Sequence, residues 1–390
     1  MLTSRSLSSL LALTLVFGLS GIFSTPAEAA YQVSATISVG GGPNGVAVNP
    51  LTNRIYVANS VDNTVSVIDG RTNAVIATIL VGLNPVGVGV NPLTNRVYVA
   101  DGGVSIGPGT VSVIDATLNS VIATIPVDQN PFAVAVNPLT NRIYVTNNFG
   151  TIDDVGDGIV SVIDGATNAV VDRLHVGTNP SGVAVNPSTN RIYVTLYAFA
   201  GGNTVQVIDG ATDAIIDSVF VNAPPWLIDV NPVTNRAYVT ECGPFCDATS
   251  VEVIDAATDT VVATVPVENN PYGVAVNAVS NVIFATNIGS DNVSIIDGTT
   301  NVVSQTLQVG SGPQGVGFNP ATLTAYVANG NSDTVSVIAA FDGIPATSNC
   351  HGKSVSALAH QFGGLSAAAT ALGFSSVQAL QGAIKAYCGQ

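Results

Sequence analysis

Acidic residues at two places in the sequence have types and spacing that could serve metal binding or proton transfer. Asp229 stands where six other copies of a repeated segment carry alanine or glycine. The run 153–158 brings together Asp153, Asp154 and Asp157, whose oxygens suit Ca²⁺, although their spacing differs from an EF-hand. Because no histidine, lysine or second acid accompanies Asp229, a buried structural acid is the expected role there, and an acidic solvated loop is expected at 153–158. We predict no cofactor, with Ca²⁺ or Mg²⁺ at these acids as the alternative.

Cysteine is the second reactive residue type. The sequence has four, at Cys242, Cys246, Cys350 and Cys388. An even count favours disulfide bonds in an oxidising compartment, and pairing within each local couple is the simplest connectivity. His351 and His360 lie near the second couple in the sequence, so a zinc site is the alternative, although the spacing matches no familiar zinc pattern.

The first 29 residues have the pattern of an export signal. Arg5 precedes an apolar run over 7–23, and the small-residue site Ala27-Glu28-Ala29 follows it. We expect a mature chain that starts near Ala30 and lies outside the cytoplasm, in the periplasm, in the medium or at the cell surface. No later apolar run is long enough to predict a transmembrane segment.

Composition favours a large all-β core. The chain is 47% hydrophobic and 9% charged, with 39 Gly and 20 Pro and a net charge of -15. Both lysines, Lys353 and Lys385, come near the C-terminus. Such an acidic surface repels phosphate backbones, so nucleic acid is an unlikely partner, and a protein, a glycan or a small molecule is expected instead.

A tandem repeat dominates the chain and must position these residues. The segment 45–50, Gly-Val-Ala-Val-Asn-Pro, returns six times, and its asparagine recurs at intervals of 42, 46, 49, 45, 46 and 42 residues. Each copy holds four short runs rich in Val, Ile, Thr and Tyr, which turn residues separate. Seven copies at this spacing predict an all-β, seven-bladed β-propeller of four-stranded blades.

The repeats also carry a family resemblance. Tyr56–Asn59 reads Tyr-Val-Ala-Asn and Tyr144–Asn147 reads Tyr-Val-Thr-Asn, and both segments resemble the signature of YVTN-type β-propeller repeats over residues 31 to about 343. The resemblance implies an extracytoplasmic, cell-surface or periplasmic propeller. More distantly it extends to lactonase-like and lyase propellers, so it does not select an activity.

The ends of the chain complete this organisation. The seventh copy lacks a fourth strand, and the segment 31–38 resembles one, so we predict that it pairs as the outer strand of blade seven. The predicted domains are an export signal over 1–29, the propeller over 30–343 and a helical segment over 344–390. In that segment, helix-like patterns over 355–362 and 377–387 predict a hairpin, and Ser375 with Gln378 predicts the cap of its second helix.

Variation among the repeats indicates a functional surface. All length differences fall between the second and third strands of blades two to five, so one face of the ring is raised there. Aromatic residues start three inner strands on that face, and two more lie in an insertion. The candidate ligand-binding residues are Phe132, Trp226, Tyr272, Tyr197 and Phe199. A plug that fills the channel is the alternative role of these aromatic groups.

The scarcity of clustered catalytic groups decides the functional prediction. We predict a non-catalytic binding or scaffold protein that uses this raised face. A metal-assisted, lactonase-like hydrolase or lyase with Asp229 as a ligand is the alternative.

Overall fold

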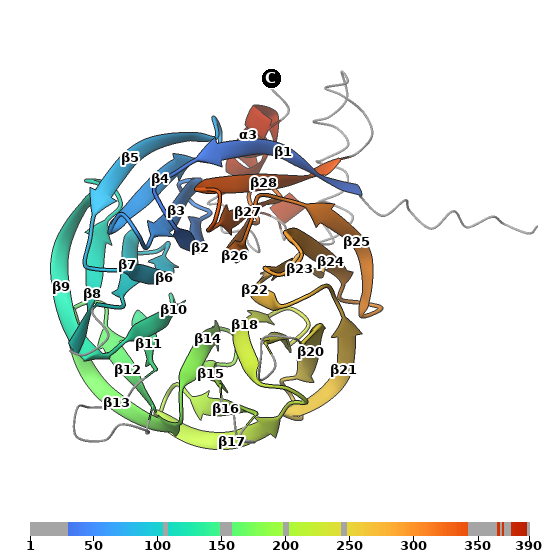
Figure 1. The fold of residues 1–390 in the computed structure, drawn as a ribbon. Coiled ribbons are helices and arrows are strands. Elements are labelled where there is room, and N and C mark those ends of the chain that lie inside the picture. The colour runs from blue at the N-terminus through green and yellow to red at the C-terminus, as the bar shows by residue number, and fades with distance from the viewer. Residues whose placement is uncertain are drawn as a thin grey trace, which may run out of the picture.

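The computed structural model describes residues 30–103, 108–148, 158–197, 203–242, 248–341, 365–366, 369 and 376–387. Within them, seven four-stranded antiparallel sheets stand as blades around a central axis (Figure 1). The predicted seven-bladed β-propeller is therefore confirmed. The predicted export signal and most of the predicted C-terminal segment lie outside the described residues.

The strands are named from the inner to the outer edge of each blade. Blade 1 has β2 (Pro43–Asn49), β3 (Arg54–Asn59), β4 (Thr64–Asp69) and β5 (Ala74–Leu80). Blade 2 has β6 (Pro85–Asn91), β7 (Arg96–Asp101), β8 (Pro108–Asp115) and β9 (Ser120–Gln129). Blade 3 has β10 (Pro131–Asn137), β11 (Arg142–Asn147), β12 (Gly158–Asp164) and β13 (Ala169–Gly177). Blade 4 has β14 (Pro180–Asn186), β15 (Arg191–Leu196), β16 (Thr204–Asp209) and β17 (Ala214–Phe220).

The remaining blades follow the same order. Blade 5 has β18 (Pro225–Asn231), β19 (Arg236–Glu241), β20 (Ser250–Asp255) and β21 (Thr260–Pro266). Blade 6 has β22 (Pro271–Asn277), β23 (Val282–Asn287), β24 (Asn292–Asp297) and β25 (Val302–Gln308). Blade 7 has β26 (Pro313–Asn319), β27 (Thr324–Asn329), β28 (Thr334–Phe341) and β1 (Ala30–Ser38).

The ring closes through its N-terminal strand, as predicted. β1 pairs antiparallel with β28 from Ala30 opposite Phe341 to Ser38 opposite Thr334. Gln305 of blade 6 also accepts a hydrogen bond from the Tyr31 backbone N–H at 2.9 Å and donates one to its carbonyl oxygen at 2.8 Å. The closing strand is thus fastened to two blades, which removes an open sheet edge.

The core lies between the blades. The middle strands are buried on both faces because each blade packs face to face with its neighbours, and their Val, Ile and Tyr side chains fill that space. The tyrosines of the second strands lie among the largest fully buried side chains, at Tyr56, Tyr98, Tyr144, Tyr193, Tyr238 and Tyr326. Outer strands such as β5 are mostly exposed to solvent instead.

Two faces of the ring differ in their loops. We call the face with the first-to-second and third-to-fourth strand loops the turn face. The opposite face, with the second-to-third strand loops and the connections between blades, is the insert face. On the turn face, the Asn49 side chain accepts a bond from the Leu51 N–H at 3.0 Å and donates to Asn95 Oδ1 of blade 2 at 2.9 Å. Equivalent Asn–Asn bonds join six of the seven blade junctions in the described residues.

One helix is described beyond the ring. α3 (Val377–Tyr387) matches the predicted second helix, whereas the predicted first helix lies outside the described residues. Its cap is Ser376, whose hydroxyl accepts a hydrogen bond from the Ala379 N–H at 3.1 Å. The predicted cap residue, Ser375, is outside the described residues. In the part of the chain that the structure describes, no helix is both long and apolar enough to cross a membrane.

Candidate functional site: the aromatic mouth of the channel

Threonines at the third position of the repeat motif in blades 3 to 6 hold the channel mouth in place. Thr195 Oγ1 accepts a hydrogen bond from the Gly182 N–H at 2.6 Å and donates one to the Trp226 carbonyl oxygen of the next blade, also at 2.6 Å. Thr240 donates to the Tyr272 carbonyl oxygen in the same way at 2.8 Å. Blades 3 and 6 repeat the arrangement, whereas blades 1, 2 and 7 carry alanine at this position. Hydrogen bonds from threonine side chains to backbone carbonyl oxygens of the next blade therefore fix the inner-strand residues that start at the mouth.

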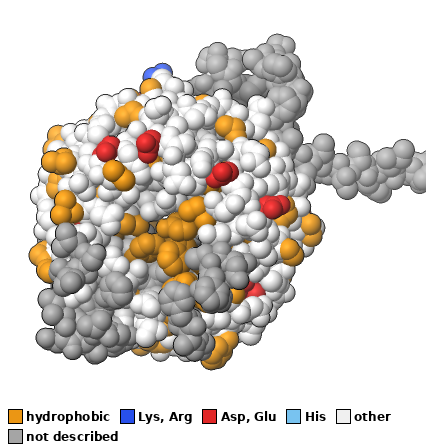
Figure 2. All heavy atoms as spheres, in the orientation of Figure 1, with side chains coloured by type: hydrophobic (Ala, Val, Ile, Leu, Met, Phe, Trp, Pro, Cys, Tyr) orange, Lys and Arg blue, Asp and Glu red, His pale blue; other side chains and the backbone are white. Residues whose placement is uncertain are grey.

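Four of the five predicted ligand-binding residues meet at this mouth. Trp226 packs against Phe132 with ring centroids 5.5 Å apart, against Tyr197 at 5.2 Å and against Tyr272 at 5.6 Å. These four residues, which we call the aromatic arc, come from blades 3, 4, 5 and 6 and are all half-buried. The fifth, Phe199, lies outside the described residues. Hydrophobic side chains gather at the centre of the ring in the space-filling view (Figure 2).

Two polar groups give the arc a hydrogen-bonding capacity. The Trp226 indole N–H is buried beside the Tyr272 hydroxyl and makes no hydrogen bond of ordinary geometry among the described residues. Burial raises the pKa of the Tyr272 hydroxyl, and the Trp226 and Asn44 side chains, which favour its ionised form, offset only part of that rise. Tyr272 is therefore a neutral phenol at physiological pH. The arc presents ring faces together with N–H and O–H groups, which suits a ligand with both apolar and polar faces.

The arc leads into a central channel. Inner strands of the blades line a cavity of about 370 Å³, mostly with Val, Ala and Gly. Asn44, Asp229 and Tyr272 supply the polar side chains of its described lining. A cavity of this size accommodates a small ligand or one end of a longer one.

Asp229 is the carboxylate of this channel lining. Its Oδ1 accepts a hydrogen bond from the Val230 N–H and its Oδ2 one from the Val276 N–H of blade 6, both at 2.8 Å. Burial raises the pKa of Asp229 to about 6, although these two bonds favour the charged form. The expected hydrogen-bonded structural role therefore fits the geometry. Among the described residues, no group of three or more acidic, histidine or cysteine side chains is placed to hold a metal ion.

Other predicted site residues are only partly described. The second-to-third strand loops of blades 2 to 5 leave 104–107, 149–157, 198–202 and 243–247 outside the described residues, and with them Asp153, Asp154, Asp157 and Cys246. Cys350 and Cys388 are outside as well. Cys242 is buried directly after β19, and its predicted pairing with Cys246 stays a prediction.

The aspartates that recur at the end of the third strand of the blades have a structural role. Asp69 Oδ1 accepts hydrogen bonds from the Arg71 N–H at 2.8 Å and the Thr72 N–H at 3.3 Å. The same turn recurs at Asp115, Asp164 and Asp209. These acids therefore close tight turns on the turn face.

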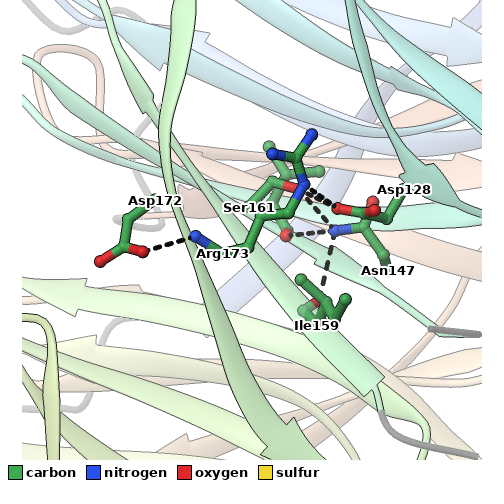
Figure 3. A network of polar contacts seen from close by, with 7 residues as sticks. Asp128, Asn147, Ile159, Ser161, Asp172 and Arg173 are labelled. Carbon is green, nitrogen blue, oxygen red and sulfur yellow. Dashed lines mark hydrogen bonds and ion pairs between the residues drawn. The ribbon is translucent and has the colours of Figure 1, made fainter. Parts of the chain in front are cut away.

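Sequence reasoning missed a set of buried polar groups below the inserted loops. Asn147 closes its repeat motif and donates to the Val145 and Ile159 carbonyl oxygens and to Ser161 Oγ, at 2.9 to 3.2 Å. Ser161 in turn donates to Asp128 of blade 2 at 3.3 Å (Figure 3). Arg173 pairs with the same Asp128 oxygen at 2.9 Å. The motif asparagine thus anchors the two strands from which an inserted loop emerges.

Acids replace this asparagine in blades 2 and 5. Asp101 accepts hydrogen bonds from Thr110 at 3.0 Å and Ser112 at 2.7 Å, and burial raises its pKa to about 6. Glu241 accepts bonds from Ser250 and from the Ala223 N–H, and burial also raises its pKa. A comparison of the last position of the motif across the seven copies would have revealed both acids.

Comparison with known proteins gives the fold alone. No protein-family model matches the chain, so membership of the YVTN-type repeat family stays a prediction. A 34-residue stretch is 65% identical to the PE-PGRS family protein PE_PGRS18 of Mycobacterium tuberculosis, but it covers 9% of this chain and 7% of that protein. Among solved structures, a chain of Kuenenia stuttgartiensis hydrazine synthase is similar, with a TM-score of 0.65 and 21% identity. The match covers 76% of this chain and 95% of that chain.

Proposed function

We propose that this propeller is a non-catalytic, extracytoplasmic binding or scaffold protein that engages a ligand or partner through its insert face. The observation that carries the proposal is the aromatic arc, in which residues from four blades meet around Trp226. We infer that the protein lies outside the cytoplasm from the export pattern of residues 1–29.

The chemistry of the arc favours a ligand with flat apolar faces and polar edges. Pyranose rings and peptide segments with aromatic side chains have this character, because both stack on aromatic groups and carry oxygens that accept hydrogen bonds. The buried Trp226 N–H supplies one donor, and the neutral Tyr272 hydroxyl supplies a donor and an acceptor. We therefore propose a glycan or an aromatic peptide segment as the ligand class.

Trp226 is also a built-in reporter for this proposal, since it is the single tryptophan of the sequence. Chain 30–390 would be screened on glycan and peptide arrays, and each hit titrated while Trp226 fluorescence is recorded. We expect a saturable change in emission, because a ligand in the arc alters the surroundings of the indole ring. Hits that leave the emission unchanged at saturation would place binding elsewhere and contradict the proposal.

Two variants separate a ligand site from a plug. Trp226→Ala removes the centre of the arc, and we expect array binding to fall at least tenfold, in line with aromatic anchors of other binding sites. Phe318→Ala is the matched control, because Phe318 lines the same channel near the turn-face end of β26 and stacks on Phe284 at 5.6 Å. If both variants lose stability and neither array gives a hit with the wild type, the arc is a plug.

The hydrolase alternative is tested on the same protein. Metal content and lactone hydrolysis would be measured for the wild type and for Asp229→Asn. The proposal predicts no stoichiometric divalent ion and no turnover that depends on Asp229. Turnover that disappears in the variant would replace the binding role with a catalytic one.

A further inference from the structure

A second cavity lies on the turn face, at the junction between blades 7 and 1. We call this junction the seam and the space the seam cavity. Its volume is about 350 Å³. The lining includes Gly70 and Asn73 of blade 1 and Thr322, Thr324 and Tyr326 of blade 7. Both partners of the ring closure therefore contribute to one site.

At three other junctions, an arginine side chain of one blade reaches into the corresponding place and bonds to the next blade. The second strand of blade 2 begins with Arg96, whose guanidinium group donates to the Gly165 carbonyl oxygen at 3.0 Å and to Asn168 Oδ1 at 3.3 Å in blade 3. Arg191 of blade 4 donates to the Ala256 carbonyl oxygen at 3.0 Å and to Asp259 at 2.8 Å in blade 5. Arg142 of blade 3 reaches Asp213 of blade 4 at 3.2 Å. The acceptors are the first and fourth residues after the turn aspartate.

The seam keeps these acceptors but lacks the arginine. β27 begins with Thr324 at the arginine position, and the Thr324 hydroxyl donates to the Thr322 carbonyl oxygen of its own blade at 3.1 Å. The equivalent acceptors in blade 1 are the Gly70 carbonyl oxygen and Asn73 Oδ1, and both residues line the cavity. Asn73 Oδ1 and Thr322 Oγ1 are buried without a hydrogen-bond partner in the described residues. A buried acceptor without a hydrogen bond costs free energy of folding. A donor that reaches these atoms would therefore bind favourably.

The buried tyrosine of the seam, Tyr326, differs from Tyr98 of blade 2 in the charges beside it. In blade 2, the neighbouring Arg96 favours ionisation of Tyr98 and partly offsets the effect of burial on its pKa. Tyr326 of blade 7 has no arginine in this role, and burial together with the charge of Asp69 raises its pKa to about 12. Of these two causes, only the negative charge of Asp69 would also favour a cation in the seam cavity.

Solvent reaches this site. Leu51 and Arg71, which line the cavity, are exposed on the turn face. The whole chain has a net charge of -15, which attracts a basic partner, whereas Arg71 at the rim opposes a cation locally. A long, flexible side chain that enters past Arg71 would therefore reach two hydrogen-bond acceptors, the Gly70 carbonyl oxygen and Asn73 Oδ1.

We propose that the seam cavity binds the guanidinium group of an arginine side chain from a basic polypeptide partner, with the Gly70 carbonyl oxygen and Asn73 Oδ1 as acceptors. A planar guanidinium group satisfies several acceptors at once, as Arg96 and Arg191 do at two of the other junctions. Such binding would also hold blade 7 against blade 1.

Blocked tripeptides test this proposal on chain 30–390. Calorimetric titration would compare acetyl-Gly-Arg-Gly-amide with its lysine and citrulline counterparts, citrulline being an uncharged isostere. We expect the arginine peptide to bind at least tenfold more tightly than either. Equal affinity for arginine and citrulline, or no saturable binding of the arginine peptide at millimolar concentration, would overturn the proposal.

Variants place the binding in the seam cavity. Thr324→Arg supplies the missing side chain from within, so we expect it to abolish peptide binding and to raise the unfolding midpoint by about 2–4 °C. Asn73→Gly should weaken binding at least tenfold, and glycine is chosen because Asn73 has a φ of 53°. Asn119→Gly, at the same turn position of blade 2 with a φ of 50°, is the matched control and should bind normally.

One further variant tests the electrostatic part. Arg71→Gln removes the opposing charge at the rim, so we expect binding of the arginine peptide to tighten severalfold. If Thr324→Arg and Asn73→Gly both leave peptide binding unchanged, the seam cavity is a packing gap and the proposal is wrong.

Discussion

Leu323 is the weak point in the turn-face network that joins neighbouring blades. The residue at its position is asparagine in the other six copies, at Asn53, Asn95, Asn141, Asn190, Asn235 and Asn281. Leu323 adopts a φ of 55°, in the left-handed region that asparagine tolerates and leucine does not. It also offers no acceptor to Asn277, so the Asn–Asn bond of the other six junctions is missing between blades 6 and 7.

Leu323→Asn is therefore expected to stabilise the ring. Relief of the left-handed conformation contributes about 1 kcal/mol. A hydrogen bond from Asn277 contributes about 1 kcal/mol more. Leu323 is 38% exposed, so loss of its partial burial costs about 1 kcal/mol. The net gain is about 1 kcal/mol, equivalent to about 2 °C in the unfolding midpoint of a chain of this size.

Urea and thermal unfolding of chain 30–390, followed by circular dichroism, would measure this change. Asn281→Leu is the reciprocal control, because it imposes leucine at a φ of 53° and removes the acceptor that Asn231 uses at 2.8 Å. We expect it to lower the midpoint by about as much or more. A lower midpoint for Leu323→Asn would show that apolar contacts outweigh the backbone strain and would refute this reasoning.

Three further predictions concern other contacts of the ring. Asp101, with a pKa raised to about 6 in the fold, contributes stability below about pH 4 that is lost as the pH rises through 6. Asp101→Asn should thus stabilise the chain by about 1–3 kcal/mol at pH 7.5 and little at pH 4, and equal unfolding midpoints at pH 7.5 would contradict it. Thr195→Val should cost about 1–3 kcal/mol and shift Trp226 emission, whereas Thr286→Val in blade 6 should lower stability without that shift. Deletion of residues 30–38 leaves β28 unpaired, so we expect a lower unfolding midpoint and aggregation by light scattering, and a monomer of unchanged stability would argue against closure by this strand.

Blade number, closure and the mouth residues were readable in the sequence. The repeat fixes strand positions because hydrophobic alternation and turn residues act over a few neighbours, and seven copies agree. The residue after each inner-strand proline varies among copies, which led to Phe132, Trp226 and Tyr272. The sequence also shows that Asp101 and Glu241 replace the motif asparagine. The raised pKa of each acid depends on its burial, which the sequence alone does not give.

The sequence alone thus determined the repeated local structure, because each turn and strand depends on nearby residues. Tertiary structure decided which side chains meet across blades. Asn319 and Asn53, 266 positions apart, form a hydrogen bond only because β1 closes the ring. The same closure leaves Asn73 Oδ1 without a partner beside Thr324. Ring contacts around Trp226 likewise depend on the angle between blades, since that angle sets the distance between inner strands that are remote in the chain.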